Sequence, residues 1–83
     1  MAEKKEFKFE IKKQLGVLSS GRSGWNREVN VVSWNDANPK IDIRDWSEDH
    51  SRMSKGISMT AEEIAVLLEI LEEIDPYEEV GAL

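Results

Sequence analysis

The sequence predicts an α+β domain in which four strands are followed by one C-terminal helix. Two observations lead to this fold class. Before residue 60, short stretches of alternating apolar and polar side chains are separated by turn residues, whereas residues 60–75 carry apolar side chains at helical spacing. Because the chain has only 83 residues, we expect a single domain, with the sheet at 6–59, the helix at 60–75 and an acidic tail at 76–83.

Recognisable turns separate the four predicted strands. The first strand, at residues 6–18, has its apolar side chains at odd positions, namely Phe7, Phe9, Ile11, Leu15 and Val17. A turn rich in serine and glycine joins it to the second strand at 25–34, and the two are expected to form a hairpin. A turn with Asn, Asp and Pro precedes the third strand at 40–46, and a polar loop precedes the short fourth strand at 55–59.

Side-chain parity assigns the two faces of the third strand. Ile41 and Ile43 fall on one face, and Arg44 and Trp46 fall on the other. An isoleucine pair on one side of a short strand is typical of a half-buried sheet. We therefore expect the isoleucines to face the core, with Arg44 and Trp46 exposed to solvent on the opposite side.

The second strand is predicted to contain an irregularity. Trp25 and Arg27 share parity with Val29, whereas Trp34 shares parity with Val32. No regular strand presents both tryptophans on the same face. A bulge or a strong twist in this strand would re-aim the side chains and bring Trp25 and Trp34 to one surface.

The helix has the clearest local signals in the chain. Thr60 is a suitable N-cap, and Glu63 three residues later completes a capping box. Pro76 cannot occupy a helix interior and disfavours helical geometry at the residue before it. The helix is therefore expected to begin after Thr60 and to end near Ile74.

The apolar face of this helix is wider than one sheet face needs. Its apolar side chains cover an arc of about 200° on a helical wheel, about twice the width needed to pack on a single sheet. The chain is also short and has no cysteine, which leaves oligomerisation as the source of extra stability. A curved sheet that wraps one helix completely is the alternative. We expect a homodimer whose helices pack through Ile64, Leu67, Leu68, Ile70, Leu71 and Ile74.

Charge is unevenly distributed along the chain. The formal net charge is −6, which taken alone argues against a nucleic-acid partner. All 11 lysine and arginine residues, however, lie at or before Lys55, and residues 61–83 contain eight acids and no base. The body is therefore mildly basic and the end is acidic. Because no apolar run approaches the roughly 20 residues of a membrane span, we expect a cytoplasmic protein with no membrane partner.

Three tryptophans, all outside the predicted helix, are the most informative residues for function. Exposed aromatic rings beside Lys or Arg suit single-stranded DNA or RNA, because bases stack on the rings and cations contact the phosphates. For any one tryptophan, covering the core is an equally good interpretation. The candidate nucleic-acid-binding residues are Lys12, Trp25, Arg27, Trp34, Lys40, Arg44, Trp46, Arg52 and Lys55.

Catalysis, cofactors and small-molecule substrates are not expected. An acidic cluster at residues 42–50 could bind a divalent ion, but strand parity puts Asp42 and Asp45 on opposite faces. No cysteine, nucleophile–base pair or phosphate-binding glycine motif is evident. The alternative function is a protein-interaction module that uses the apolar helix and the acidic tail.

The segment from the third strand through the helix resembles a known family. Its residues 39–71 read PKIDIRDWSEDHSRMSKGISMTAEEIAVLLEIL and are similar to the C-terminal domain of the transcriptional positive cofactor four family. The similarity is closer to the small YdbC-like bacterial relatives, which also share elements like residues 24–25 and 32–36. The resemblance implies a curved antiparallel sheet and dimerisation through the helices. It also implies binding of single-stranded DNA with little sequence specificity, in transcription, replication or repair.

The resemblance also assigns several site residues. Arg44 and Trp46 fall on matching motif positions, and Lys55 opens the KGIS element. Trp34 lies close to a loop aromatic that stacks on bases in the family. These assignments imply that Arg44, Trp46, Lys55 and Trp34 contact the strand, and the other candidates extend the same surface.

Overall fold

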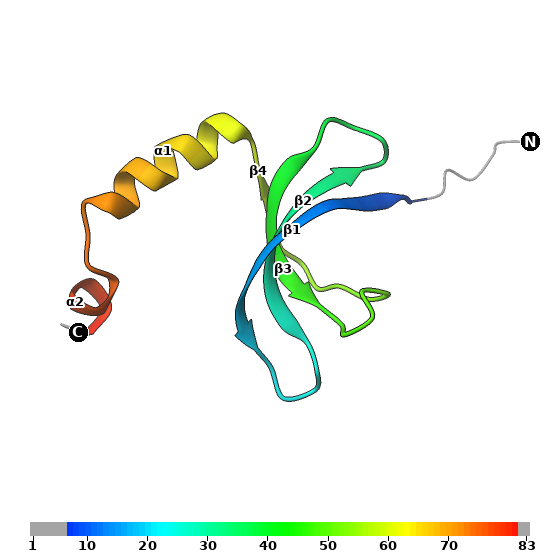
Figure 1. Cartoon of the computed structure of the whole chain (residues 1–83), viewed down its shortest axis with the longest axis horizontal. Coiled ribbons are helices and arrows are strands. Elements are labelled where there is room, and N and C mark those ends of the chain that lie inside the picture. Colours follow the sequence, from blue (N-terminus) through cyan, green and yellow to red (C-terminus); the bar gives the residue numbers. More distant parts are fainter. Residues whose placement is uncertain (1–6, 82–83) are drawn as a thin grey trace, which may run out of the picture.

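The computed structural model describes residues 7–81 and has six elements. These are β1 (Phe9–Ser20), β2 (Asn26–Trp34), β3 (Lys40–Trp46), β4 (Ile57–Met59), α1 (Ala61–Glu72) and α2 (Pro76–Gly81). The strands form one antiparallel sheet in the order β1-β2-β3-β4, and the helices follow it (Figure 1). The predicted fold class is therefore confirmed. Residues 76–81 of the predicted acidic tail form a second helix, α2, which was not expected. Residue 6 of the predicted sheet and residues 82–83 of the predicted tail lie outside the described residues.

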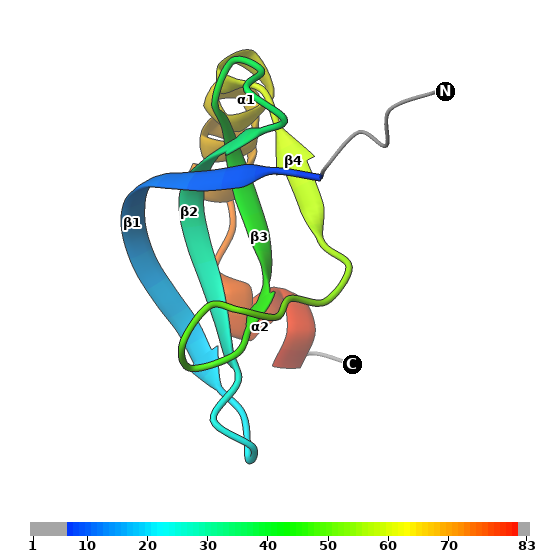
Figure 2. The same cartoon turned by 90° about the vertical axis from the view of Figure 1, so that its right-hand side faces the viewer.

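Three irregularities interrupt the pairing of β1 with β2. The register shifts between Ile11 and Lys13, between Gln14 and Gly16, and between Val17 and Ser19, and each shift adds one residue to β1. Extra residues on one strand bend it and increase its twist, and β1 does bend strongly along its length (Figure 2). The regular alternation predicted for residues 6–18 is therefore wrong.

The irregularity predicted within the second strand does not lie there. The pairing of β2 with β3 runs without a break from Asn26 to Val32. The extra residues belong to β1, so nothing in β2 re-aims Trp25 toward the face of Trp34. The prediction was wrong because a parity conflict in one strand says nothing about which strand of a pair carries the extra residue.

One face of the sheet is enclosed, and we call it the inner face. It carries Glu28, Asn30 and Val32 of β2 together with Asp42 and Trp46 of β3, and all five side chains are buried. Trp46 is 0% exposed, which overturns its predicted exposure. Because β1 bends and the loop after β3 folds back, the sheet closes over this face.

The residues that cover Trp46 come from distant parts of the chain. The ring of Phe9 lies 5.2 Å from the Trp46 ring, and the imidazole of His50 lies 5.5 Å from it. His50 also holds the loop to the sheet, because its Nε2 lies 2.9 Å from a carboxylate oxygen of Glu28. The predicted orientation of β3 is thus inverted, since Ile41 and Ile43 lie only half-buried on the other, outer face.

Helix α1 begins as predicted. The hydroxyl of Thr60 accepts a hydrogen bond from the Glu63 backbone N–H at 3.1 Å, and the Thr60 backbone N–H donates to the Glu63 carboxylate at 2.9 Å. The capping box is therefore confirmed. The helix ends at Glu72, two residues before the predicted Ile74, because the next backbone N–H groups bond three residues back and tighten the chain.

The two helices stand apart from the sheet. Helix α1 leads away from β4 and α2 turns back at its far end (Figure 1). No side chain of α1 is buried, and Leu68 and Ile70 are each 56% exposed. Within residues 7–81, no helix is long and apolar enough to cross a membrane.

Candidate nucleic-acid interface

Three aromatic side chains gather at one end of the sheet, and we call them the aromatic platform. Phe9 pairs with Trp34 across β1 and β2, and Phe7 precedes β1. The ring centroids of Phe7 and Trp34 are 5.8 Å apart, and those of Phe9 and Trp34 are 6.0 Å apart. Phe7 is 62% exposed and Trp34 is half-buried. The platform therefore presents aromatic surface to solvent, which suits stacking of unpaired bases.

A closed ring of interactions holds Trp34, and we call its other three members, Asp42, Arg44 and Ser58, the tryptophan bracket. The indole Nε1–H donates to the Ser58 hydroxyl at 3.0 Å, and that hydroxyl donates to Asp42 Oδ2 at 2.7 Å. Arg44 donates to both Asp42 oxygens, at 2.6 and 2.7 Å. Its guanidinium carbon lies 4.5 Å from the centroid of the Trp34 ring, so Arg44 also contacts the ring itself.

The exposed cations predicted to bind the strand divide into two groups. Lys40, Arg52 and Lys55 are exposed and form no salt bridge with any residue between 7 and 81. Lys12 instead lies 3.2 Å from a carboxylate oxygen of Glu10. The first three can therefore contact a phosphate without giving up an acidic partner.

Lys40 lies close to the tryptophan, and Lys55 follows a residue that contacts Arg44. Lys40 begins β3 and pairs with Val32, two residues before Trp34 on the same face of β2. Lys55 follows Ser54, whose backbone carbonyl accepts a hydrogen bond from Arg44 at 3.3 Å. The structure therefore brings Lys40 near Trp34, whereas it links Lys55 to Trp34 only through Ser54 and Arg44.

Arg27 is separated from the platform. It has the opposite parity to Trp34 in β2 and lies on the outer face, paired with Asp45 of β3. Its guanidinium donates to the Asp45 carboxylate at 2.9 Å. This hydrogen bond raises the pKa of Arg27 above its ordinary value and lowers the pKa of Asp45. Arg27 is thus already engaged, on the wrong side of the sheet for a contact with the platform.

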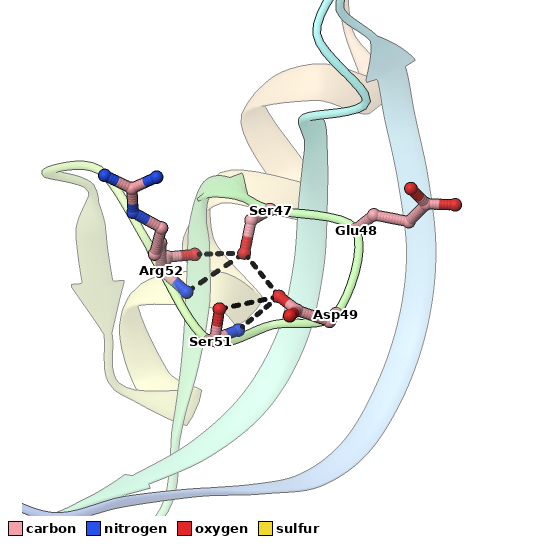
Figure 3. A pocket seen from close by; sticks show the side chains of 5 residues that line it. All are labelled: Ser47, Glu48, Asp49, Ser51 and Arg52. Atoms are coloured by element: carbon pink, nitrogen blue, oxygen red, sulfur yellow. Dashed lines mark hydrogen bonds between the residues drawn. The ribbon is translucent and has the colours of Figure 1, made fainter.

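The loop after β3 has its own hydrogen-bond network (Figure 3). Asp49 Oδ1 accepts hydrogen bonds from the Ser51 hydroxyl at 2.7 Å, the Ser51 backbone N–H at 3.0 Å and the Ser47 hydroxyl at 3.0 Å. These bonds, the Ser51 hydroxyl above all, lower the pKa of Asp49 to about 2. Figure 3 shows the guanidinium of Arg52 pointing away from this network, so the loop holds its own shape and leaves Arg52 available.

The acids that the sequence grouped as a divalent-ion site are dispersed. Asp42 bonds to Arg44, and Asp45 bonds to Arg27. Across residues 7–81, no three His, Cys, Asp or Glu side chains converge on a position that could hold a metal ion. These carboxylates serve as partners for arginines and for the loop backbone.

The predicted site residues therefore have different outcomes. Trp34 and Arg44 come together near Lys40, but Trp46 is buried, and the prediction that it is an exposed stacking residue is wrong. Trp25 is half-buried and lies in the turn directly before β2.

Four residues of this surface are not among the candidate nucleic-acid-binding residues predicted from the sequence: Phe7, Phe9, Asp42 and Ser58. Alternation assigns Phe7 and Phe9 to the apolar side chains of a regular strand, and their position at its free end is the only signal available. Asp42 belongs to the acidic cluster that could bind a divalent ion. Nothing in the sequence marked Ser58.

Two comparisons with known proteins bear on the family of this chain. A family model described as Transcriptional Coactivator p15 (PC4) matches residues 22–70, which contain β2, β3, β4 and most of α1. A protein of Treponema pallidum (strain Nichols), described as uncharacterized, is 40% identical over 74 residues, which are 87% of this chain and 87% of that protein. The matched region includes Trp34 and its bracket, whereas Phe7 and Phe9 lie before the family match.

Proposed function

The chain belongs to the family described as Transcriptional Coactivator p15 (PC4), and from this premise we propose that it binds single-stranded DNA with little sequence specificity. The observation that carries the proposal is the exposed aromatic platform with the exposed Lys40 near it. The family description suggests transcription as the process that uses this binding.

Base stacking on the platform gives the preference for single strands. Phe7 and Trp34 present ring surface that an unpaired base can cover, and each stacked base contributes about 1–3 kcal/mol. Bases in a duplex are already stacked and paired, so they are not free to use this surface. Stacking does not depend on which base is present, which accounts for low sequence specificity.

Phosphate contacts come from Lys40, Arg52 and Lys55. These side chains are exposed, and none has an acidic partner among residues 7–81. Each phosphate neutralised on a single strand changes the slope of log K against log salt by about 0.7. Lys12 and Arg27 would first have to leave Glu10 and Asp45, so we assign them smaller contributions. Trp25 stays a prediction.

A homodimer would complete the binding unit. The apolar side chains of α1 are unburied in the single chain, and a second copy related by a two-fold axis would cover them. We propose that the interface uses Ile64, Leu67, Leu68, Ile70, Leu71 and Ile74. Two platforms on one dimer would raise the apparent affinity for a long strand, because the second contact is intramolecular.

The decisive experiment is a titration with oligo-dT at low salt, followed by tryptophan fluorescence. We expect quenching in the wild type, and we expect Trp34→Ala or Phe7→Ala to weaken binding by about tenfold. Leu18→Ala is the matched control, because Leu18 is an exposed apolar side chain on β1 outside the platform. No quenching at low salt, or equal affinity for duplex DNA of the same length, would contradict the proposal.

A further inference from the structure

We infer that Arg44 is a positioning residue that holds the Trp34 ring ready for stacking, and that it does not bind phosphate. Asp42 and Ser58 share this role. The inference deepens the proposed function and rests on it. It separates Arg44 from Lys40, Arg52 and Lys55, with which the sequence grouped it.

The charge of Arg44 is already neutralised. The side chain is only 14% exposed, and it donates to both oxygens of Asp42, which is fully buried. Its remaining terminal nitrogen, Nη1, donates to the Ser54 carbonyl at 3.3 Å. Moving this guanidinium to a phosphate would leave the Asp42 carboxylate buried without its cation, which is strongly unfavourable.

The same contacts orient the indole. Ser58 accepts from Trp34 Nε1 and donates to Asp42, while the guanidinium lies over the ring. Three strands thus meet at one side chain, because Trp34 ends β2, Asp42 and Arg44 lie on β3, and Ser58 is the middle residue of β4. A ring that is fixed before binding loses less conformational freedom when a base stacks on it.

The backbone around the bracket is closely packed. A Cβ added at Gly56 would overlap both Arg44 Cβ and the Ile43 carbonyl oxygen. The chain entering β4 therefore passes directly over the stem of Arg44 and restricts its side chain. This close approach favours a fixed structural partner over a mobile ligand of the DNA backbone.

The salt dependence of oligo-dT binding tests the role of Arg44. We expect Arg44→Lys to weaken binding by about fivefold and Arg44→Ala by at least as much, because alanine also removes the cation from Asp42, with the slope of log K against log salt unchanged in both. Lys55→Ala is the matched control and should reduce the slope by about 0.7. A reduction of about 0.7 in Arg44→Ala that Arg44→Lys restores would overturn the inference.

A second measurement needs no DNA, so it separates the inference from the proposed function. The Trp34 indole N–H should exchange slowly with solvent in the free protein, as read by NMR, and Ser58→Ala and Arg44→Lys should accelerate it. Ser58→Thr, which keeps the hydroxyl, should preserve the protection. Equal exchange in wild type and Ser58→Ala would refute the positioning role, whereas a wild type that ignores oligo-dT would refute the binding proposal alone.

Discussion

The inner face of the sheet and helix α1 differ in which side chains they bury. The inner face buries charged and polar residues such as Asp42 and Asn30 completely, whereas α1 leaves Leu68 and Ile70 more than half exposed. Each inner-face charge has a partner, Arg44 for Asp42 and His50 for Glu28, so its burial is tolerated. Leu68 and Ile70 of α1 have no comparable cover among residues 7–81.

The contrast shows which region a single chain can complete. The bend of β1 and the loop after β3 close the inner face from within one molecule. No element closes over α1, which departs from the sheet (Figure 1). A chain of this size buries a limited share of its surface, and the proposed second copy would cover the helix.

Removal of the ring at the centre of the inner face should have the largest effect. Trp46→Ala is expected to reduce the free energy of unfolding by about 3–5 kcal/mol, because it empties a fully buried site. Urea unfolding of the purified protein measures this. Trp46→Phe should cost much less, since Trp46 Nε1 has no hydrogen-bond acceptor among the described residues and its loss breaks no bond. Equal losses in both variants would mean that the indole is specifically required.

The helix should respond in a concentration-dependent way. Leu68→Ala is expected to remove about 1.5–3 kcal/mol of apolar burial per copy, which raises the dimer Kd by tenfold or more. Analytical ultracentrifugation over a dilution series measures the Kd. Glu69→Ala is the neighbouring control on the same helix and should leave the Kd nearly unchanged. If the wild type stays monomeric at high concentration, no second copy covers α1, and the proposed homodimer would be wrong.

A smaller loss is expected at the close contact between β3 and the entry to β4. Gly56→Ala places a methyl group against Arg44 and the Ile43 carbonyl, so we expect a cost of about 1–3 kcal/mol in the free energy of unfolding. Gly16→Ala is the matched control, since no heavy atom lies within 4 Å of its added Cβ. Thermal unfolding of the two variants side by side would show the difference, and a Gly56→Ala protein as stable as Gly16→Ala would be inconsistent with this packing.

The weakest effect concerns the loop that helps to close the inner face. The pKa of Asp49 falls from 3.8 to about 2 on folding, so its contribution to stability is present above about pH 4 and is lost as the pH falls through about 2. NMR titration of the Asp49 carboxyl should give this pKa. Ser51→Ala should raise it toward 3.8, because the Ser51 hydroxyl is its strongest partner. An unchanged pKa in Ser51→Ala would exclude that cause.

Local signals predicted the parts of this molecule that depend on near neighbours in the chain. The start of α1 at Thr60, the hairpin between the first two strands and the order of elements all follow from caps, turns and periodicity. These features involve residues a few positions apart, so their physics is contained in short segments of sequence. The width of the apolar face on the helix also depends only on residues within one short segment.

Tertiary structure alone decided which face of the sheet is inside. Parity correctly grouped Arg44 with Trp46 and opposed both to Ile41, but it carries no information about which way a sheet curls. That depended on three extra residues in β1 and on a loop that places His50 over Trp46. The sequence by itself therefore determined the four strands, the first helix and their order, but not α2, whereas the enclosure that buried Trp46 came from contacts between residues far apart in the chain.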